Sequence, residues 1–515
     1  MRTTLLTAAF IILCVTTTNG NPDSRYYELG VKGYELVLDM RYDEADQIFE
    51  EMIRMEPKNA IAYLYKSQSF FHSWQYSYLT PDKKDLEQFK ALLFKTKDIA
   101  VAMPEKDNLE TQFIIGGAYG NIGLYYANTN GWVRAWWNGR KGIKYIKKII
   151  EKDPEYAEAY FLLGMYNYYA ATLPKVIKSL SFLLGSSEGS REDGIKQLII
   201  ASSKGDFKGD AKIFLADSVY FEEKNYNAAS VLLEELTVEY PNNHYLRLIL
   251  AVCYRNQNRF DLSIKVLKSS LKSETIKDFP YLYGVTYYAL GRAYSGINEY
   301  EKAIQAQINS YKILKRVKGI IKDDYDVWSL YEIGNAYEMT GEIERAHIYY
   351  SEIKQNNKIA YKSAQARIKN PLTPARIKLI KGRNYMKYGK YSIAEPVLRD
   401  LIDSELKDPS SSTIKAEASL YLGELEYHLN KYQDSIRTLS KVFTFNKVAK
   451  EWINPWAHYW LARCYSEIGE AKKAEKEYDT AYKYDDNKIR SEIDKARSDM
   501  VLPVKNPDVN QAVKQ

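Results

Sequence analysis

The sequence predicts an all-α solenoid, in which helical hairpins stack one after another. Small residues recur at intervals of 34 to 48 residues, and each lies inside a stretch with the apolar spacing of an amphipathic helix. Tyrosine is unusually frequent, at 46 of 515 residues, as suits helices that interlock through large side chains. A hydrophobic content of 45% and a charged content of 27% are normal for a folded protein.

The segment GYELVLDMRYDEADQIFEEMIRMEPKN shows the repeated pattern most completely. Gly33 and Ala45 are small enough to let two helices approach closely, and Phe49 is large enough to fill the space between hairpins. Pro57 then ends the second helix, because proline lacks an N–H and clashes with the preceding turn.

The same pattern recurs in phase along the chain. Its small first-helix position is occupied by Gly33, Asp217, Ala251, Gly291, Gly334, Gly382, Gly423 and Ala462. This pattern resembles the tetratricopeptide (TPR) repeat, and the resemblance implies a right-handed superhelix whose concave wall is formed by the first helices. Where the spacing widens after Gly291, we expect lengthened helices and longer connections rather than inserted domains.

Four regions follow from these patterns: a signal peptide at 1–20, irregular hairpins at 21–206, a regular array at 207–485, and a capping helix with a frayed tail at 486–515. The signal peptide is indicated by Arg2, by the apolar run from Leu5 to Val15, and by small residues before Asn21. We therefore expect export to the periplasm or the cell envelope. A lipoprotein anchored through Cys14 is the less favoured alternative, and no later segment is long and apolar enough to cross a membrane.

Only Cys253 and Cys464 remain after removal of the signal peptide, and two thiols cannot form a disulfide framework in a chain of this size. Both fall inside predicted first helices, so we expect buried structural thiols.

Residues 59–153 predict two elongated hairpins. Gly116, Gly117, Gly120 and Gly123 lie in a helical pattern, which indicates a tight helix crossing rather than a phosphate-binding loop. Trp132, Trp136 and Trp137 follow within one and a half turns. They either pack against the neighbouring repeat or face a ligand.

Residues 155–217 carry further motifs: Leu163-Gly164, Leu173-Pro174, Leu183-Leu184-Gly185 and Gly189-Ser190-Arg191. These resemble a TPR branch of bacterial envelopes, and the related eukaryotic family linked to clearance of inclusion bodies and to the mitochondrial outer membrane. The resemblance implies an envelope protein without enzymatic activity. Ser190 is expected to cap the following helix.

The sequence offers no catalytic, metal-binding or cofactor-binding motif. Its five histidines are scattered singly, and HExxH, CxxC, GxxxxGK[ST] and GxSxG patterns do not occur. The net charge of +7 is too dilute to indicate nucleic-acid binding. We therefore expect neither an enzyme nor a cofactor.

A partner is expected to bind the concave face, because rigid aromatic rings and forked guanidinium groups grip an extended peptide well. The residues predicted to face inward are Tyr288, Arg292, Trp328, Tyr331, Asn335, Arg383, Tyr427, Trp456, Tyr459 and Arg463. Alternatively, the arginines pair with acids on adjacent helices, such as Glu332 and Glu424, and the tyrosines only pack. The function predicted is an exported scaffold that binds a protein or peptide. The alternative is a protein that binds a glycan or small ligand in an aromatic-lined groove.

Overall fold

The computed structural model describes residues 25–77, 83–103, 108–129, 131–172, 190–205, 207–317, 324–445, 451–484 and 487–501. Within these ranges the chain is helical throughout and forms no strand, which confirms the predicted all-α helical repeat. The predicted signal peptide, Cys14 and the motifs between Leu173 and Gly189 lie outside the described residues.

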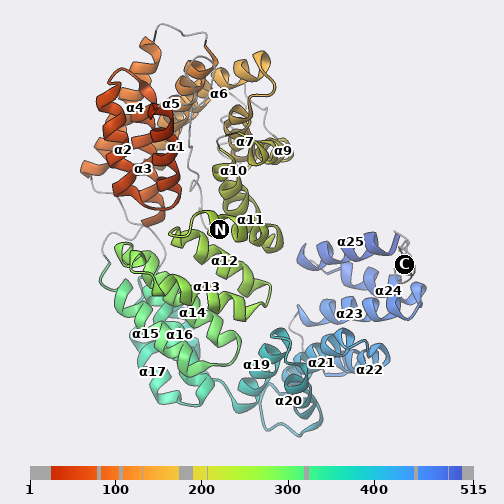
Figure 1. The fold of residues 1–515 in the computed structure, drawn as a ribbon. Coiled ribbons are helices and arrows are strands. Elements are labelled where there is room, and N and C mark those ends of the chain that lie inside the picture. Colours follow the sequence, from red (N-terminus) through yellow and green to blue (C-terminus); the bar gives the residue numbers. More distant parts are fainter. Residues whose placement is uncertain are drawn as a thin grey trace, which may run out of the picture. The chain divides into compact units, whose positions relative to one another are not determined.

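Figure 1 shows the helices coloured along the sequence. The chain divides into two units. The first comprises Met1–Ala293 and Lys302–Glu332, and the second comprises Tyr294–Glu301 and Ile333–Gln515. The helices up to residue 272 are α1 (Arg25–Leu38), α2 (Tyr42–Met55), α3 (Ala60–Ser77), α4 (Lys83–Ala102), α5 (Leu109–Asn128), α6 (Trp132–Lys152), α7 (Ala157–Thr172), α9 (Arg191–Ser203), α10 (Lys208–Phe214), the π-helix η1 (Leu215–Phe221), α11 (Tyr226–Glu239), α12 (His244–Asn256) and α13 (Phe260–Lys272). After them come the 3₁₀ turn η2 (Thr275–Asp278), α14 (Pro280–Gly296), α15 (Tyr300–Leu314), α16 (Tyr325–Thr340), α17 (Ile343–Ser351), α18 (Lys358–Lys369), α19 (Pro374–Lys387), α20 (Tyr391–Asp403), α21 (Ser411–His428), α22 (Tyr432–Phe445), α23 (Ile453–Glu467), α24 (Ala471–Tyr482) and α25 (Asn487–Val501).

Each regular hairpin is locked by a small residue of its first helix against a large residue of its second helix, sixteen positions later. The pairs are Gly33 with Phe49, Gly291 with Gln307, Gly334 with Tyr350, Gly382 with Leu398, and Gly423 with Leu439. A Cβ atom at any of these glycines would come within 2.5–3.0 Å of the opposing side chain. The small residue is therefore required by the close approach of the two helices.

The turn inside each regular hairpin has a left-handed residue, seven positions after the small one. These residues are Met40, Lys224, Asn258, Asn298, Gly341, Gly389, Asn430 and Gly469, with φ between 59° and 89°. Glycine and asparagine tolerate this conformation best, so the three asparagines and three glycines suit their positions better than Met40 and Lys224 do.

One widened interval differs from the expectation of lengthened helices. Between Gly334 and Gly382 the extra residues form a separate helix, because α17 ends at Ser351 and α18 begins at Lys358. Asn357 caps α18 by accepting a hydrogen bond from the backbone N–H of Ala360 at 2.9 Å. The expected cap at Ser190 is confirmed in the same way, since its Oγ accepts from the N–H of Asp193 at 2.9 Å.

The first hairpin also contacts the middle of the chain. Asp39 accepts hydrogen bonds from the backbone N–H and the side-chain amide of Asn242, both at 2.7 Å, and Tyr34 donates to the buried Asp210 at 2.7 Å. Repeats of an open solenoid contact only their neighbours. The first unit therefore adds a contact between distant hairpins to the contacts between successive ones.

Other sequence predictions can be compared directly. Residues 59–153 form the two expected long hairpins, α3–α4 and α5–α6. Cys253 and Cys464 are free and buried, which confirms the structural interpretation. Helix α25 packs Ile489 and Ile493 against Tyr459 and Tyr478 at the end of the second unit.

Candidate partner-binding face

The ten residues predicted to line a partner-binding face all lie on first helices of regular hairpins. The first unit holds Tyr288, Arg292, Trp328 and Tyr331, and the second unit holds Asn335, Arg383, Tyr427, Trp456, Tyr459 and Arg463. Three of the tyrosine side chains are nearly covered: Tyr288 is 8% exposed, Tyr427 is 9% and Tyr459 is 5%. These three rings therefore act mainly in packing.

Arg292 on α14 is paired within the protein. Its Nε lies 3.4 Å from a Glu332 oxygen on α16, and its Nη1 donates to the Tyr288 hydroxyl at 3.2 Å. Burial lowers the pKa of Arg292, but Glu332 together with the phenols of Tyr288 and Tyr325 outweighs burial, and the pKa is raised. The alternative expectation, pairing of Arg292 with Glu332, is confirmed.

Trp328 and Tyr331 lie together on α16, with ring centroids 5.8 Å apart in an edge-to-face arrangement. Asn335 follows one turn after Tyr331 and is half-buried. Helix spacing thus brings the three side chains to one side of α16.

Arg463 on α23 binds two phenol groups. Its Nη2 donates to the Tyr427 hydroxyl at 2.8 Å and its Nη1 to the Tyr459 hydroxyl at 3.4 Å. Tyr427 in turn donates to Glu467 at 2.9 Å. Burial raises the pKa of Tyr427 to about 12, so the phenol stays protonated and able to donate. Trp456 packs edge-on against Tyr459 at 5.6 Å.

Arg383 on α19 is different, because its hydrogen-bonding capacity is not used up. Its Nη2 lies 3.5 Å from Asn384 Oδ1, at the limit of hydrogen bonding. Its Nε is buried, and no acceptor for it is found among the described residues. Tyr421 on α21 hydrogen-bonds with Arg383. Burial raises the pKa of that phenol, and the charge of Arg383 and this hydrogen bond oppose the rise. The Arg383 side chain is thus half-buried, with its Nε–H enclosed by the protein.

Two buried ion pairs between neighbouring helices were missed by the sequence reasoning. Glu338 is fully buried and accepts from Arg367 and, at 2.8 Å, from Tyr350. Arg376 Nη1 lies 2.7 Å from Glu417, whose side chain is 8% exposed. An acid at an otherwise apolar or small first-helix position was the available signal for both pairs.

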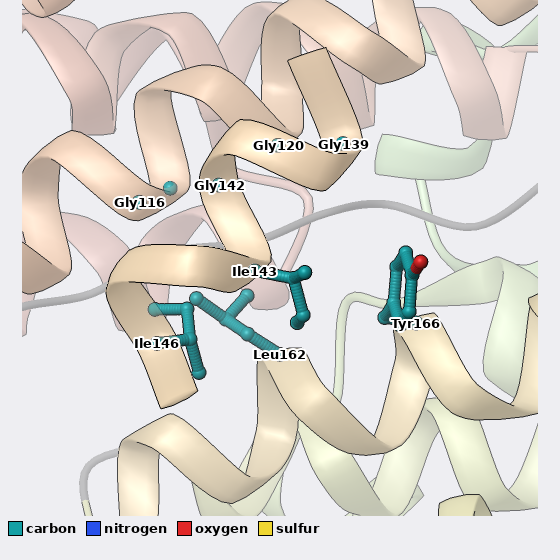
Figure 2. A pocket seen from close by; sticks show the side chains of 9 residues that line it. Gly116, Gly120, Gly139, Gly142, Ile143, Ile146, Leu162 and Tyr166 are labelled. Carbon is teal, nitrogen blue, oxygen red and sulfur yellow. The ribbon is translucent and has the colours of Figure 1, made fainter. Parts of the chain in front are cut away.

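The glycines of α5 form a close helix crossing with α6, as expected. A Cβ at Gly142 would lie 2.5 Å from the Gly116 carbonyl oxygen, and one at Gly123 would lie 3.0 Å from the Ala135 carbonyl oxygen. Figure 2 shows the glycine-lined crossing with Ile143, Ile146 and Leu162 beside it. The glycines therefore serve helix packing.

The described residues contain no group of three His, Cys, Asp or Glu side chains placed to hold a metal ion. In the same part of the chain, no helix combines the length and apolarity needed to cross a bilayer.

Comparison with known families gives one match. Residues 381–442, which include α20, α21, the second half of α19 and most of α22, match the tetratricopeptide repeat family. A search of curated proteins found no match to this sequence.

Among solved structures, similar helical chains include a tetratricopeptide repeat protein from Parabacteroides merdae, with 14% identity and a TM-score of 0.24 over 57% of this chain and 99% of that one. The apo quorum sensor NprR from B. thuringiensis has 14% identity and a TM-score of 0.34 over 81% and 97% of the two chains. The TPR domain of P58(IPK) has 15% identity and a TM-score of 0.21 over 93% and 98%. These values are too low to transfer any property. The family match places tetratricopeptide repeat sequence at 381–442, and hairpins outside that segment share its glycine-against-large-residue packing.

Proposed function

We propose that this protein is an exported, non-catalytic scaffold that binds a protein or an extended peptide along the first helices of its repeats. The observation that carries the proposal is the half-buried guanidinium of Arg383, whose Nε has no acceptor among the described residues. The Arg383 side chain as a whole is half-buried, so a carboxylate or backbone carbonyl of a bound chain can approach its exposed part.

The arrangement favours a peptide over a glycan. Sugars stack on the faces of aromatic rings, but Tyr288, Tyr427 and Tyr459 are each less than a tenth exposed. A peptide binds largely through hydrogen-bonding groups, which the arginines and Asn335 of these helices provide.

Selection of peptides from a random phage-displayed library on the purified protein tests the proposal. We expect selected peptides to bind the wild type and to lose at least about tenfold in affinity with Arg383→Gln, because a hydrogen bond to a charged group contributes about 1.5–3 kcal/mol. Arg437→Gln is the matched control, since Arg437 lies on a second helix, 75% exposed, and pairs with Asp434. Failure to select any peptide, or equal binding by both variants, would refute the proposal.

Export is part of the proposal and is tested separately. It is supported by Arg2, the apolar run from Leu5 to Val15, and the small residues before Asn21. The mass of the mature protein, isolated from its native source, should correspond to a chain that begins at Asn21. A mass that includes residues 1–20 would contradict export by cleavage.

A further inference from the structure

The outward face of helix α6 begins with exposed apolar side chains. Trp132 is 37% exposed, Val133 65% and Trp137 53%. The opposite side of the same helix is buried through Gly142, Ile146 and Ile149, so its attachment to the protein core does not need these side chains. Trp132 and Trp137 therefore leave a large part of their ring surface exposed.

The exposed side chains form one apolar tip with a cation beside it. Trp137 meets Trp136 edge-on with ring centroids 5.1 Å apart, and the Arg140 guanidinium lies 5.2 Å from the Trp136 ring centroid. Val133 and Trp137 are one helical turn apart, so both lie on the same face. Indole rings beside cationic groups are typical of the boundary between lipid headgroups and acyl chains.

Basic residues continue along the helix from this tip. Helix α6 contains one acidic residue, Glu151, and seven basic ones: Arg134, Arg140, Lys141, Lys144, Lys147, Lys148 and Lys152. All seven are exposed. The whole chain carries a net charge of only +7, so this one helix concentrates a positive excess nearly as large as that of the entire protein.

We propose that the outward face of α6 docks on the surface of an anionic lipid bilayer. In this docking Trp132, Val133 and Trp137 enter the interfacial layer, and the basic residues of α6 bind lipid phosphates. The proposal does not depend on peptide binding at Arg383, which lies in the other unit.

Charge and apolarity together favour lipid over other polyanions. A bilayer presents an anionic layer directly above an apolar one, which matches a basic helix with an apolar tip. Nucleic acids also bind basic, aromatic surfaces, but through ring stacking. Val133 is the most exposed of the three apolar side chains and is aliphatic, so it offers nothing to a base.

Vesicle flotation of the full chain tests the proposal, with phosphatidylcholine vesicles prepared with and without phosphatidylglycerol. We expect binding only when phosphatidylglycerol is present, weakening as salt is added. Lys144→Gln with Lys148→Gln should weaken binding about 30-fold, because each basic residue near an anionic surface contributes roughly 1 kcal/mol. Val133→Ser with Trp137→Ser should weaken binding roughly tenfold or more, because apolar insertion adds to the electrostatic attraction.

Two matched controls separate this face from general surface effects. Lys265→Gln with Lys268→Gln removes two exposed charges from α13, and Val238→Ser removes an 81% exposed side chain from α11. Both controls should bind as the wild type does. No binding to phosphatidylglycerol vesicles would overturn the proposal, as would equal losses in the controls. Unchanged vesicle binding by the Val133 and Trp137 variant would also overturn it. So would a single-stranded oligonucleotide that displaces the vesicles from the wild type and whose own binding is weakened by the Trp137 substitution.

Discussion

Substitution of Gly142 by alanine should loosen the crossing of α5 and α6. The added Cβ would lie 2.5 Å from the Gly116 carbonyl oxygen and 3.1 Å from the Gly120 backbone nitrogen. Both contacts are with backbone atoms, so no side-chain rotation can relieve them and the helices must move apart. Gly139 is a control on the same helix, because nothing lies within 4 Å of the position of its Cβ.

The free energy of unfolding should change in opposite directions at Gly142 and Gly139. Overpacking of a close interface costs about 1–3 kcal/mol. Alanine is a better helix former than glycine by about 1 kcal/mol, and this gain applies to both variants. Gly142→Ala should therefore be less stable than the wild type by up to about 2 kcal/mol, and Gly139→Ala should be more stable by about 1 kcal/mol.

Hydrogen exchange measured by mass spectrometry reads this difference locally. Peptides from α5 and α6 should exchange faster in Gly142→Ala, by up to about 30-fold, and more slowly in Gly139→Ala, because exchange follows the free energy of local opening. If the two variants protect these peptides equally, the close backbone contact does not determine the crossing and the reasoning is refuted.

Three further outcomes are expected. Lys224→Gly should raise the free energy of unfolding measured in urea by about 1 kcal/mol, because Lys224 has φ +63° and glycine adopts that conformation without strain; a lower free energy of unfolding would contradict this. Burial raises the pKa of Asp217 from 3.8 to about 7, so the folded protein binds the proton more tightly and stability should fall as the pH rises between these values. Asp217→Asn, which keeps the acceptor for the Tyr245 hydroxyl at 2.9 Å, should flatten that slope in unfolding curves taken across this range, whereas an unchanged slope would exclude Asp217 as its source. Asp39→Ala removes two hydrogen bonds from Asn242 and should lower the free energy of unfolding by about 1.5–3 kcal/mol, with faster hydrogen exchange in both α1 and α12. Faster exchange in α1 alone would contradict a stabilising contact between Asp39 and Asn242.

The repeat could be predicted because each hairpin depends on local sequence. A small residue and a large one sixteen positions later meet wherever two helices form a close hairpin, as Gly33 and Phe49 or Gly423 and Leu439 do. The left-handed turn residue was also present in the sequence, as asparagine or glycine in most hairpins. It was missed because Met40 and Lys224 interrupt the pattern.

The contact between the first hairpin and the middle of the chain could not be predicted. It joins residues 203 positions apart, Asp39 and Asn242, and neither residue type is unusual for a turn or a helix end. No local periodicity encodes a pairing at such a separation. A buried acid such as Asp210, paired with Tyr34, is recognised only when both segments are seen together.

The candidate site was predicted in position but not in chemistry. Arg292, Arg383 and Arg463 occupy the same repeat position, yet their surroundings differ. Tyr288 and Tyr459 stand one turn before Arg292 and Arg463 and accept their N–H groups.

The residue one turn before Arg383 is Leu379, which is 1% exposed and offers no acceptor. The repeat therefore supplies a phenol one turn earlier to two of the three arginines, whereas the phenol that hydrogen-bonds with Arg383 is that of Tyr421 on the neighbouring first helix α21. In the other two repeats the guanidinium helps hold neighbouring first helices together. At Arg383 the buried Nε–H has no acceptor among the described residues, and this distinguishes the repeat of Arg383 from the other two.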